Sequence, residues 1–108
     1  MEIEAIRERV ARGDYFVLSH ASLHALKGGF IPRDMAKAVL QGKIIEEYPA
    51  DQRLLICGRV ELIPNVSVYL HVVCEYADPI SIEFVTAYLP DERQWENPPF
   101  TRRRKGRK

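Results

Sequence analysis

The sequence predicts an α+β fold in which N-terminal helices pack on one face of a roughly four-stranded antiparallel meander sheet. Apolar residues recur at helical spacing in the first 42 residues and change to strand-like runs from Lys43 onward. Short turns that contain proline separate the later runs. Because the helices precede the strands, we expect them to lie together on one side of the sheet.

The first predicted helix covers residues 2–12. Ile3, Ile6 and Val10 fall on one helical face, and charged side chains fill the opposite face. Gly13 follows at a position where a left-handed residue commonly ends a helix. The pattern therefore predicts an amphipathic helix whose apolar stripe faces the core.

Two further helices are predicted before the sheet. Ser19 suits the N-cap of a helix over residues 20–27, which a glycine pair ends. Pro32 stands where proline is favoured, at the start of a third helix that runs to about residue 41. The side chains of this third helix that we expect to face inward are Met35, Val39 and Leu40.

Four strand-like runs follow the helices, over residues 43–48, 54–60, 68–76 and 80–88. The earlier apolar segment 15–18 is too short to be assigned to a helix or a strand by its pattern. Trp95 lies in a proline-containing stretch after the last run. We expect this tryptophan to fold back on the sheet or the helices and to close the core.

Charge divides the chain into two parts. Residues 102–108 hold 6 of the 16 basic residues and no acid, which leaves 10 basic and 15 acidic residues, a charge of −5, in residues 1–101. We therefore predict one domain over residues 1–100 and a flexible basic tail over residues 101–108. Such a tail attracts polyphosphates, and docking on the acidic body or on an acidic partner is the competing interpretation.

The composition excludes several classes of protein. No apolar run approaches the ~20 residues of a membrane span, and the first residues contain acids and no apolar signal-like segment. The length and the 46% hydrophobic content suit one soluble globular domain. Cys57 and Cys74 stand in apolar runs, so we expect two buried, reduced thiols in a cytoplasmic protein.

Three histidines are the first candidates for chemistry. His20 and His24 would share one helical face, and His71 could complete a zinc site. The sequence lacks the His-Glu-x-x-His and Cys-x-x-Cys patterns of common zinc sites, so no metal or cofactor is predicted. The alternative is that His20 packs at the start of its helix and that His24 is exposed.

Metal-free cleavage of RNA would need a base, an acid and cations around the phosphate. The residues that supply these chemical types are His20, His71, Tyr88, Arg53 and Lys43. Each also has a structural alternative. His71 could be solvated on one face of a strand, Tyr88 could be a phenol at the edge of the core, and Arg53 could pair with Asp51 or Glu46.

Several short motifs occur in an order that resembles a known family. The motifs are SHA at residues 19–21, IIEEYP at 44–49, LHVV at 70–73, VTAY at 85–88, and Trp95. Together they resemble the small bacterial proteins grouped as domain of unknown function 4258, over roughly residues 15–104. The resemblance implies an α+β fold of the toxin-like RelE and BrnT kind. Its motif positions are His20, His71, Tyr88 and Trp95, and His24 stands where an arginine is usual.

Two functional hypotheses follow from the residues and the resemblance together. The first is a toxin-like protein that binds or cleaves RNA, with RNA and an antitoxin-like protein as its expected partners. The alternative is a non-enzymatic module that binds a protein or a nucleic acid, so the sequence leaves open whether the protein is an enzyme. The predicted catalytic residues are His20, His71 and Tyr88. The predicted nucleic-acid-binding residues are Arg53, Arg102, Arg103, Arg104, Lys105, Arg107 and Lys108.

Overall fold

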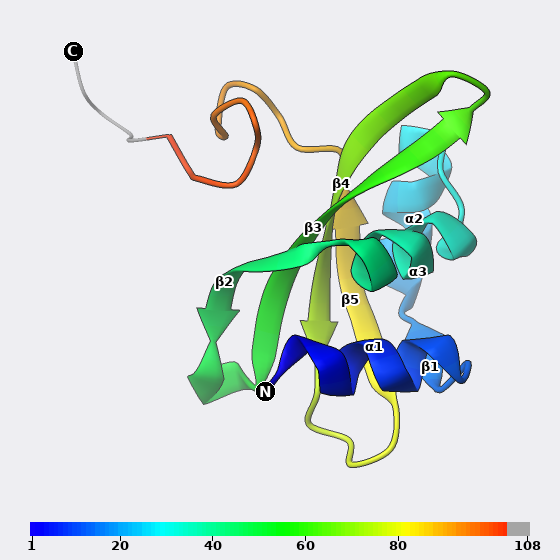
Figure 1. The fold of residues 1–108 in the computed structure, drawn as a ribbon, viewed down its shortest axis with the longest axis vertical. Helices are drawn as coiled ribbons and strands as arrows, with labels where there is room; N and C mark the ends of the chain where they lie inside the picture. The colour runs from blue at the N-terminus through cyan, green and yellow to red at the C-terminus, as the bar shows by residue number, and fades with distance from the viewer. Residues whose placement is uncertain (104–108) are drawn as a thin grey trace.

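The chain folds around one sheet, with its helices on one side. The computed structural model describes residues 1–103, which form three α-helices, five strands and one short 3₁₀ turn (Figure 1). The predicted α+β fold is therefore confirmed. The elements in chain order are α1 (Ile3–Ala11), β1 (Tyr15–Val17), α2 (Ser19–Gly28), α3 (Pro32–Gln41), β2 (Lys43–Tyr48), η1 (Pro49–Asp51), β3 (Arg53–Ile63), β4 (Val66–Glu75) and β5 (Ile82–Tyr88).

The sheet is mixed. Its strand order is β1-β5-β4-β3-β2, and β1 runs parallel to β5 whereas the other neighbours are antiparallel. The predicted antiparallel meander is confirmed for β2 to β5, but it is wrong for the whole sheet, which has a fifth and parallel strand. β1 is three residues long, and its first residue, Tyr15, pairs with Ile82, 67 residues further along the chain. So short a strand shows no alternation that a sequence pattern could detect.

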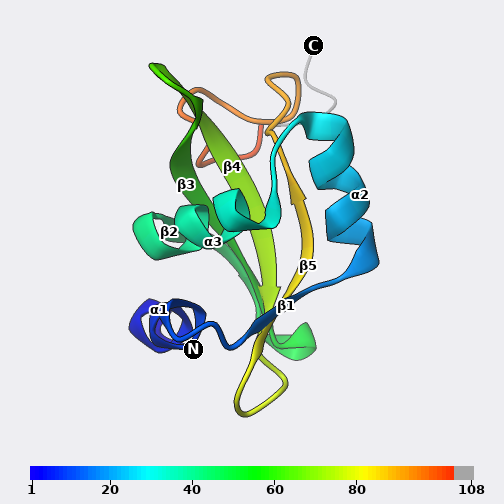
Figure 2. The same ribbon diagram turned by 90° about the vertical axis from the view of Figure 1, so that its right-hand side faces the viewer.

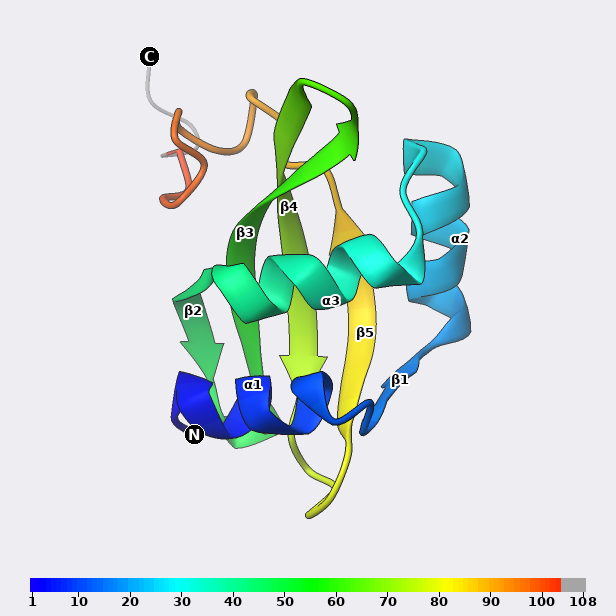
Figure 3. The ribbon, with the colours of Figure 1, turned by 45° about the vertical axis from the view of Figure 1, so that its right-hand side comes forward.

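The helices cover one face of the sheet and bury the main core against it. α1 and α3 cross this face, and α2 lies along β5 (Figures 2 and 3). Within residues 1–103, no helix is long and apolar enough to cross a membrane. The core includes Ile6, Val10, Met35, Val39, Leu54, Ile56, Leu70, Val72, Ile82 and Phe84.

α3 approaches β3 closely because small residues face each other at the contact. Ala36 and Ala38 are buried on the α3 face that covers the sheet, and Gly58 of β3 lies against Ala38. A Cβ atom at Gly58 would lie 2.6 Å from the Ala38 Cα and C atoms, so only glycine fits here. The prediction that Leu40 faces inward is wrong, since its side chain is 38% exposed and the two alanines occupy the inner face.

The starts of α2 and α3 are stabilised differently. Ser19 is the first residue of α2, and Leu18 stands at the N-cap without a side-chain hydrogen bond, so the prediction of Ser19 as N-cap is wrong. At α3, Asp34 Oδ2 accepts a hydrogen bond from the backbone N–H of Ile31 at 3.0 Å. Pro32 occupies the first turn of α3, as predicted, where its missing N–H leaves no helical hydrogen bond unmade.

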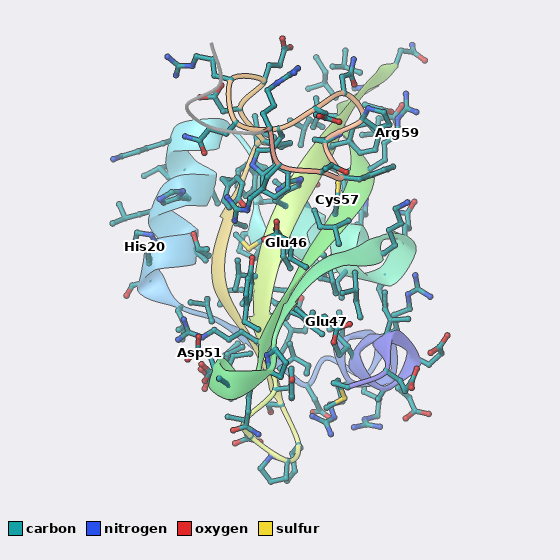
Figure 4. The ribbon with its side chains drawn as sticks, turned by 90° about the vertical axis from the view of Figure 1, so that its left-hand side faces the viewer. His20, Glu46, Glu47, Asp51, Cys57 and Arg59 are labelled. Carbon is teal, nitrogen blue, oxygen red and sulfur yellow. The ribbon has the colours of Figure 1, made fainter. Side chains whose placement is uncertain are left out.

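The face of the sheet opposite the helices, here called the outer face, is partly covered by residues 89–103, here called the C-terminal strap (Figure 4). The strap closes on itself through a bridge between Trp95 and Arg102 and a hydrogen bond from the Glu96 N–H to the Thr101 carbonyl. Trp95 is only 2% exposed, so the prediction that it packs back on the folded body is confirmed. Residues 101–103, which fall in the predicted tail, are thus part of the strap.

Candidate nucleic-acid interface

Two of the three predicted catalytic residues meet on the outer face. His71 of β4 is the register partner of Tyr88 of β5. Their ring centroids are 5.2 Å apart, and the His71 Nδ1 atom lies 3.4 Å from the Tyr88 hydroxyl oxygen. The Trp95 ring covers His71 edge-on at 4.4 Å. The strap therefore lies directly over this pair.

His71 is fully buried, and both of its ring nitrogens have partners. Nε2 lies 2.8 Å from the Pro99 carbonyl oxygen. A carbonyl can only accept, so Nε2 carries the proton, and in the neutral ring Nδ1 is left to accept from the Tyr88 hydroxyl. The alternative of a solvated His71 is wrong, since its exposed fraction is 0%. Neither nitrogen is open to a substrate while the strap is in place.

Burial also sets the protonation states of this pair. Burial lowers the pKa of His71, and the Pro99 carbonyl and the Glu46 carboxylate oppose this only in part. Burial raises the pKa of Tyr88 to about 12. At neutral pH both side chains are therefore uncharged, and one neutral hydrogen bond, from His71 Nε2–H to the Pro99 carbonyl, joins this pair to the strap.

A lowered pKa at His71 predicts a loss of stability in weak acid. The unfolded chain binds a proton to this ring more readily than the folded chain does. The free energy of unfolding should therefore be highest above the ordinary histidine pKa of 6.5 and should fall as the pH drops below it. Urea unfolding over this range, kept above the ordinary carboxylate pKa of 4.5 so that Glu46 contributes little, measures the effect.

His71→Gln should remove this part of the pH dependence, whereas His20→Gln, a change at an exposed position, should leave it intact. Titration of the His71 ring by NMR gives the same answer without a variant. A His71 pKa at or above the ordinary value of 6.5 would contradict the burial described here.

The third predicted catalytic residue does not join this pair. His20 is exposed on α2, as Figure 4 shows, and its ring contacts His24 at a centroid distance of 4.5 Å. In the part of the chain that the structure describes, no three His, Cys, Asp or Glu side chains are placed to hold a metal ion. The zinc site considered from the three histidines is therefore not formed, because His71 is enclosed under the strap.

The first arginines of the predicted basic tail dock on the folded body. Arg102 donates to both carboxylate oxygens of Glu46, at 2.8 and 3.1 Å, and its guanidinium lies 4.6 Å above the Trp95 ring. Arg103 donates from Nε to the Glu92 carbonyl at 2.6 Å. Docking on an acid of the body is thus observed for Arg102, whereas Arg103 binds a backbone carbonyl within the strap. The predicted tail residues Arg104, Lys105, Arg107 and Lys108 lie outside the described residues.

Glu46 is the acceptor at the centre of this docking site. Burial alone would raise the pKa of Glu46, but the hydrogen bonds from Arg102 and Tyr48 outweigh it and lower the pKa. The bond to Glu46 in turn raises the pKa of Arg102. The pair is therefore charged across the neutral range, with a carboxylate on β2 holding the end of the strap.

Arg53, the remaining predicted nucleic-acid-binding residue, is paired with an acid. Its Nε lies 2.8 Å from a carboxylate oxygen of Glu75, its register neighbour on β4. This ion pair neutralises the charge of Arg53 locally.

A basic groove is formed at the junction of α3, β2, β3 and the strap. It is a pocket of about 270 Å³ whose lining includes Lys43, Arg59, Tyr69 and Phe100. The Lys43 Nζ atom lies 3.9 Å from the centre of the Phe100 ring, and the Arg59 guanidinium lies 5.8 Å from that of Tyr69. Figure 4 shows Arg59 near the strap, on the end of the outer face opposite Asp51.

The groove continues into a second hollow that Arg59 shares with Lys37 of α3. Within residues 1–103, none of Lys37, Lys43 and Arg59 forms a salt bridge. Sequence reasoning found Lys43 but missed Lys37 and Arg59. Arg59 is exposed between the buried Gly58 and Val60, as strand alternation would predict for a charged residue. Nothing in the sequence, however, places Arg59 beside α3.

The two cysteines are buried and form no disulfide, as predicted. Cys57 lies in the lining of the basic groove. Burial raises its pKa to about 11, although the charge of Lys43 opposes this. The thiol is therefore protonated at neutral pH, and it is not placed to act as a nucleophile there.

Comparisons with known proteins show no relative of this chain. No family model matches it, and no significant match is found among the curated proteins or the solved structures. The resemblance to domain of unknown function 4258 therefore stays a prediction.

Proposed function

We propose that this protein binds single-stranded RNA through the basic groove without cleaving it. The observation that carries the proposal is the gathering of three cations, Lys37, Lys43 and Arg59, that form no salt bridge within residues 1–103. Two of them, Lys43 and Arg59, lie beside aromatic rings. Cations bind the phosphates of a nucleic acid, and aromatic side chains bind unstacked bases. The resemblance implies RNA as the polymer, since the proteins it points to are toxin-like.

Cleavage is less well supported than binding. A general base must reach the proton that it removes, directly or through one water molecule. The nitrogens of His71 instead face the Pro99 carbonyl and the Tyr88 hydroxyl. His20, the other candidate base, lies on α2 against His24. Wild-type protein incubated with labelled RNA should therefore leave it at full length, and accumulation of fragments that His71→Gln abolishes would contradict this.

The double substitution Lys43→Glu and Arg59→Glu should weaken RNA binding at least about tenfold at low salt. It should also reduce the dependence of log affinity on log salt concentration by about 1.4, since each neutralised phosphate of a single strand contributes about 0.7. Fluorescence anisotropy of a labelled oligoribonucleotide at several salt concentrations measures both quantities.

The matched control is Lys27→Glu with Arg33→Glu, which makes the same change of net charge at two exposed helix positions. This control should keep most of the affinity. If both double variants lose the same affinity, binding depends on net charge and not on the groove. Absence of binding by the wild type at low salt would refute the proposed function altogether.

A further inference from the structure

A second pocket, here called the strap pocket, lies on the other side of Tyr69 from the basic groove. It is lined by residues of β4 and the strap and measures about 230 Å³. Tyr69 lines both hollows, and it packs edge-on against Phe100 at 5.6 Å. Phe100 lines the groove, whereas the preceding residue, Pro99, lines the strap pocket. A strand bound in the groove would therefore pass the mouth of the strap pocket.

The lining of the strap pocket combines apolar and polar residues. The walls come from Val68, Leu89 and Trp95, besides Tyr69. The pocket is smaller than the roughly 300–1,000 Å³ of sites for drug-sized ligands, so it suits a single small ring system. Apolar and aromatic side chains in the lining favour contact with the faces of such a ring.

The polar groups of the lining are Glu92, Glu96 and Asn97. Ionised carboxylates can only accept hydrogen bonds, whereas the asparagine amide both donates and accepts. The complementary ring carries adjacent N–H donors beside an acceptor. Guanine has this edge, since its N1–H and N2–H₂ groups can face a carboxylate while its O6 faces the amide. Adenine and cytosine offer one amino group beside ring acceptors, and uracil offers one N–H between two carbonyls.

We propose that the strap pocket binds one guanine base of an RNA strand whose phosphates lie in the basic groove. The proposal rests on the proposed function. Two cations of the strap lie near this pocket. Arg103 donates to the Glu92 carbonyl, and Arg102 lies over the Trp95 ring that lines the pocket. The strap pocket contains acidic residues and the basic groove contains cations, and Tyr69 lines both.

Trp95 is the only tryptophan of the chain, so its fluorescence reports on the strap pocket. Titration of the whole protein with free nucleosides tests the pocket alone, because nucleosides carry no phosphate to bind the groove. Guanosine should change the Trp95 emission at concentrations at least about tenfold lower than adenosine, cytidine or uridine, as expected for a bidentate contact to one base. Equal responses to all four nucleosides would overturn the proposal.

Glu92→Gln combined with Glu96→Gln should reduce this preference to about threefold or less, because the acceptors facing the two N–H groups are weakened. Glu47→Gln, at an exposed β2 position, is the control and should keep the preference. The Lys43→Glu, Arg59→Glu variant should keep the guanosine response and bind RNA at least about tenfold more weakly at low salt.

The affinity for oligoribonucleotides gives a second test, which does not depend on the Trp95 emission. One guanine placed in a run of uracils should raise affinity about tenfold over the all-uracil strand, and the Glu92→Gln, Glu96→Gln variant should lose this gain. Equal affinity for the two strands would overturn the guanine site and leave the proposed function standing. If the all-uracil strand fails to bind at low salt, the proposed function itself fails.

Discussion

Gly58→Ala should lower the free energy of unfolding by about 3 kcal/mol, because it forces α3 away from the sheet. The new Cβ atom would lie 2.6 Å from the Ala38 Cα and C atoms and closer still to the Ala38 carbonyl oxygen. These are backbone atoms of a helix, so no change of side-chain rotamer can relieve the overlap. Urea unfolding followed by circular dichroism measures the loss.

Gly13→Ala is the control for this substitution. Gly13 has a positive φ of 86°, but no atom lies within 4 Å of an added Cβ. The substitution should therefore cost only the backbone strain, about 1–2 kcal/mol, without any steric overlap. The Gly58 variant should therefore be the less stable of the two. A smaller cost at Gly58 than at Gly13 would show that α3 does not lie as close to β3 as described. Because α3 and β3 together line the hollow between Lys37 and Arg59, RNA binding should fall with the stability.

Trp95→Ala should cost about 4 kcal/mol, within the range for truncation of a large buried aromatic side chain. The ring is 2% exposed, contacts His71 and lies beneath the Arg102 guanidinium, so its loss leaves a cavity under the strap. Water should then reach His71, and the pKa of that ring should rise toward its ordinary value. Urea unfolding measures the first effect and an NMR titration of His71 measures the second.

Phe16→Ala is the matched control, since this aromatic side chain is 60% exposed on β1 and its truncation should cost about 1 kcal/mol or less. Trp95→Phe, which keeps an aromatic ring over His71, should fall between the two. If Trp95→Ala cost no more than Phe16→Ala, the strap would not be part of the folded body. An unchanged His71 pKa in Trp95→Ala would likewise mean that the strap does not shield this ring.

Local patterns predicted the elements whose partners are near in the sequence. The bounds of β2 agree with the predicted run over residues 43–48, and the β3–β4 hairpin turns at Pro64 and Asn65, between the predicted runs 54–60 and 68–76. β1 could not be predicted, because three residues carry no period and its pairing depends on β5. The prediction for the inner face of α3 is partly wrong. Hydrophobicity favours Leu40 on this face, whereas the close approach of α3 to β3 requires a small residue, Ala38.

The candidate site was predictable in its chemistry but not in its accessibility. Chemical type and the motif resemblance singled out His71 and Tyr88, and the structure pairs them. Trp95 and Pro99 enclose His71, and Pro99 lies 28 residues further along the chain. A local sequence pattern cannot predict that residues so distant will cover this side chain. The same applies to the basic groove, where Lys43 and Arg59 become neighbours only through the folding of the strap and the sheet.

The parallel pairing of β1 with β5 has a consequence for synthesis of the chain. Tyr15 pairs with Ile82 and Val17 with Phe84, so the first strand to leave the ribosome waits for the last strand of the sheet. α2 also packs on β5 and must wait with it. By contrast, β2, β3 and β4 can pair as soon as each is made. Distant pairings form slowly, so the nascent chain should expose the apolar faces of its first two helices until residue 84 has emerged. Chaperones can bind these faces during that interval.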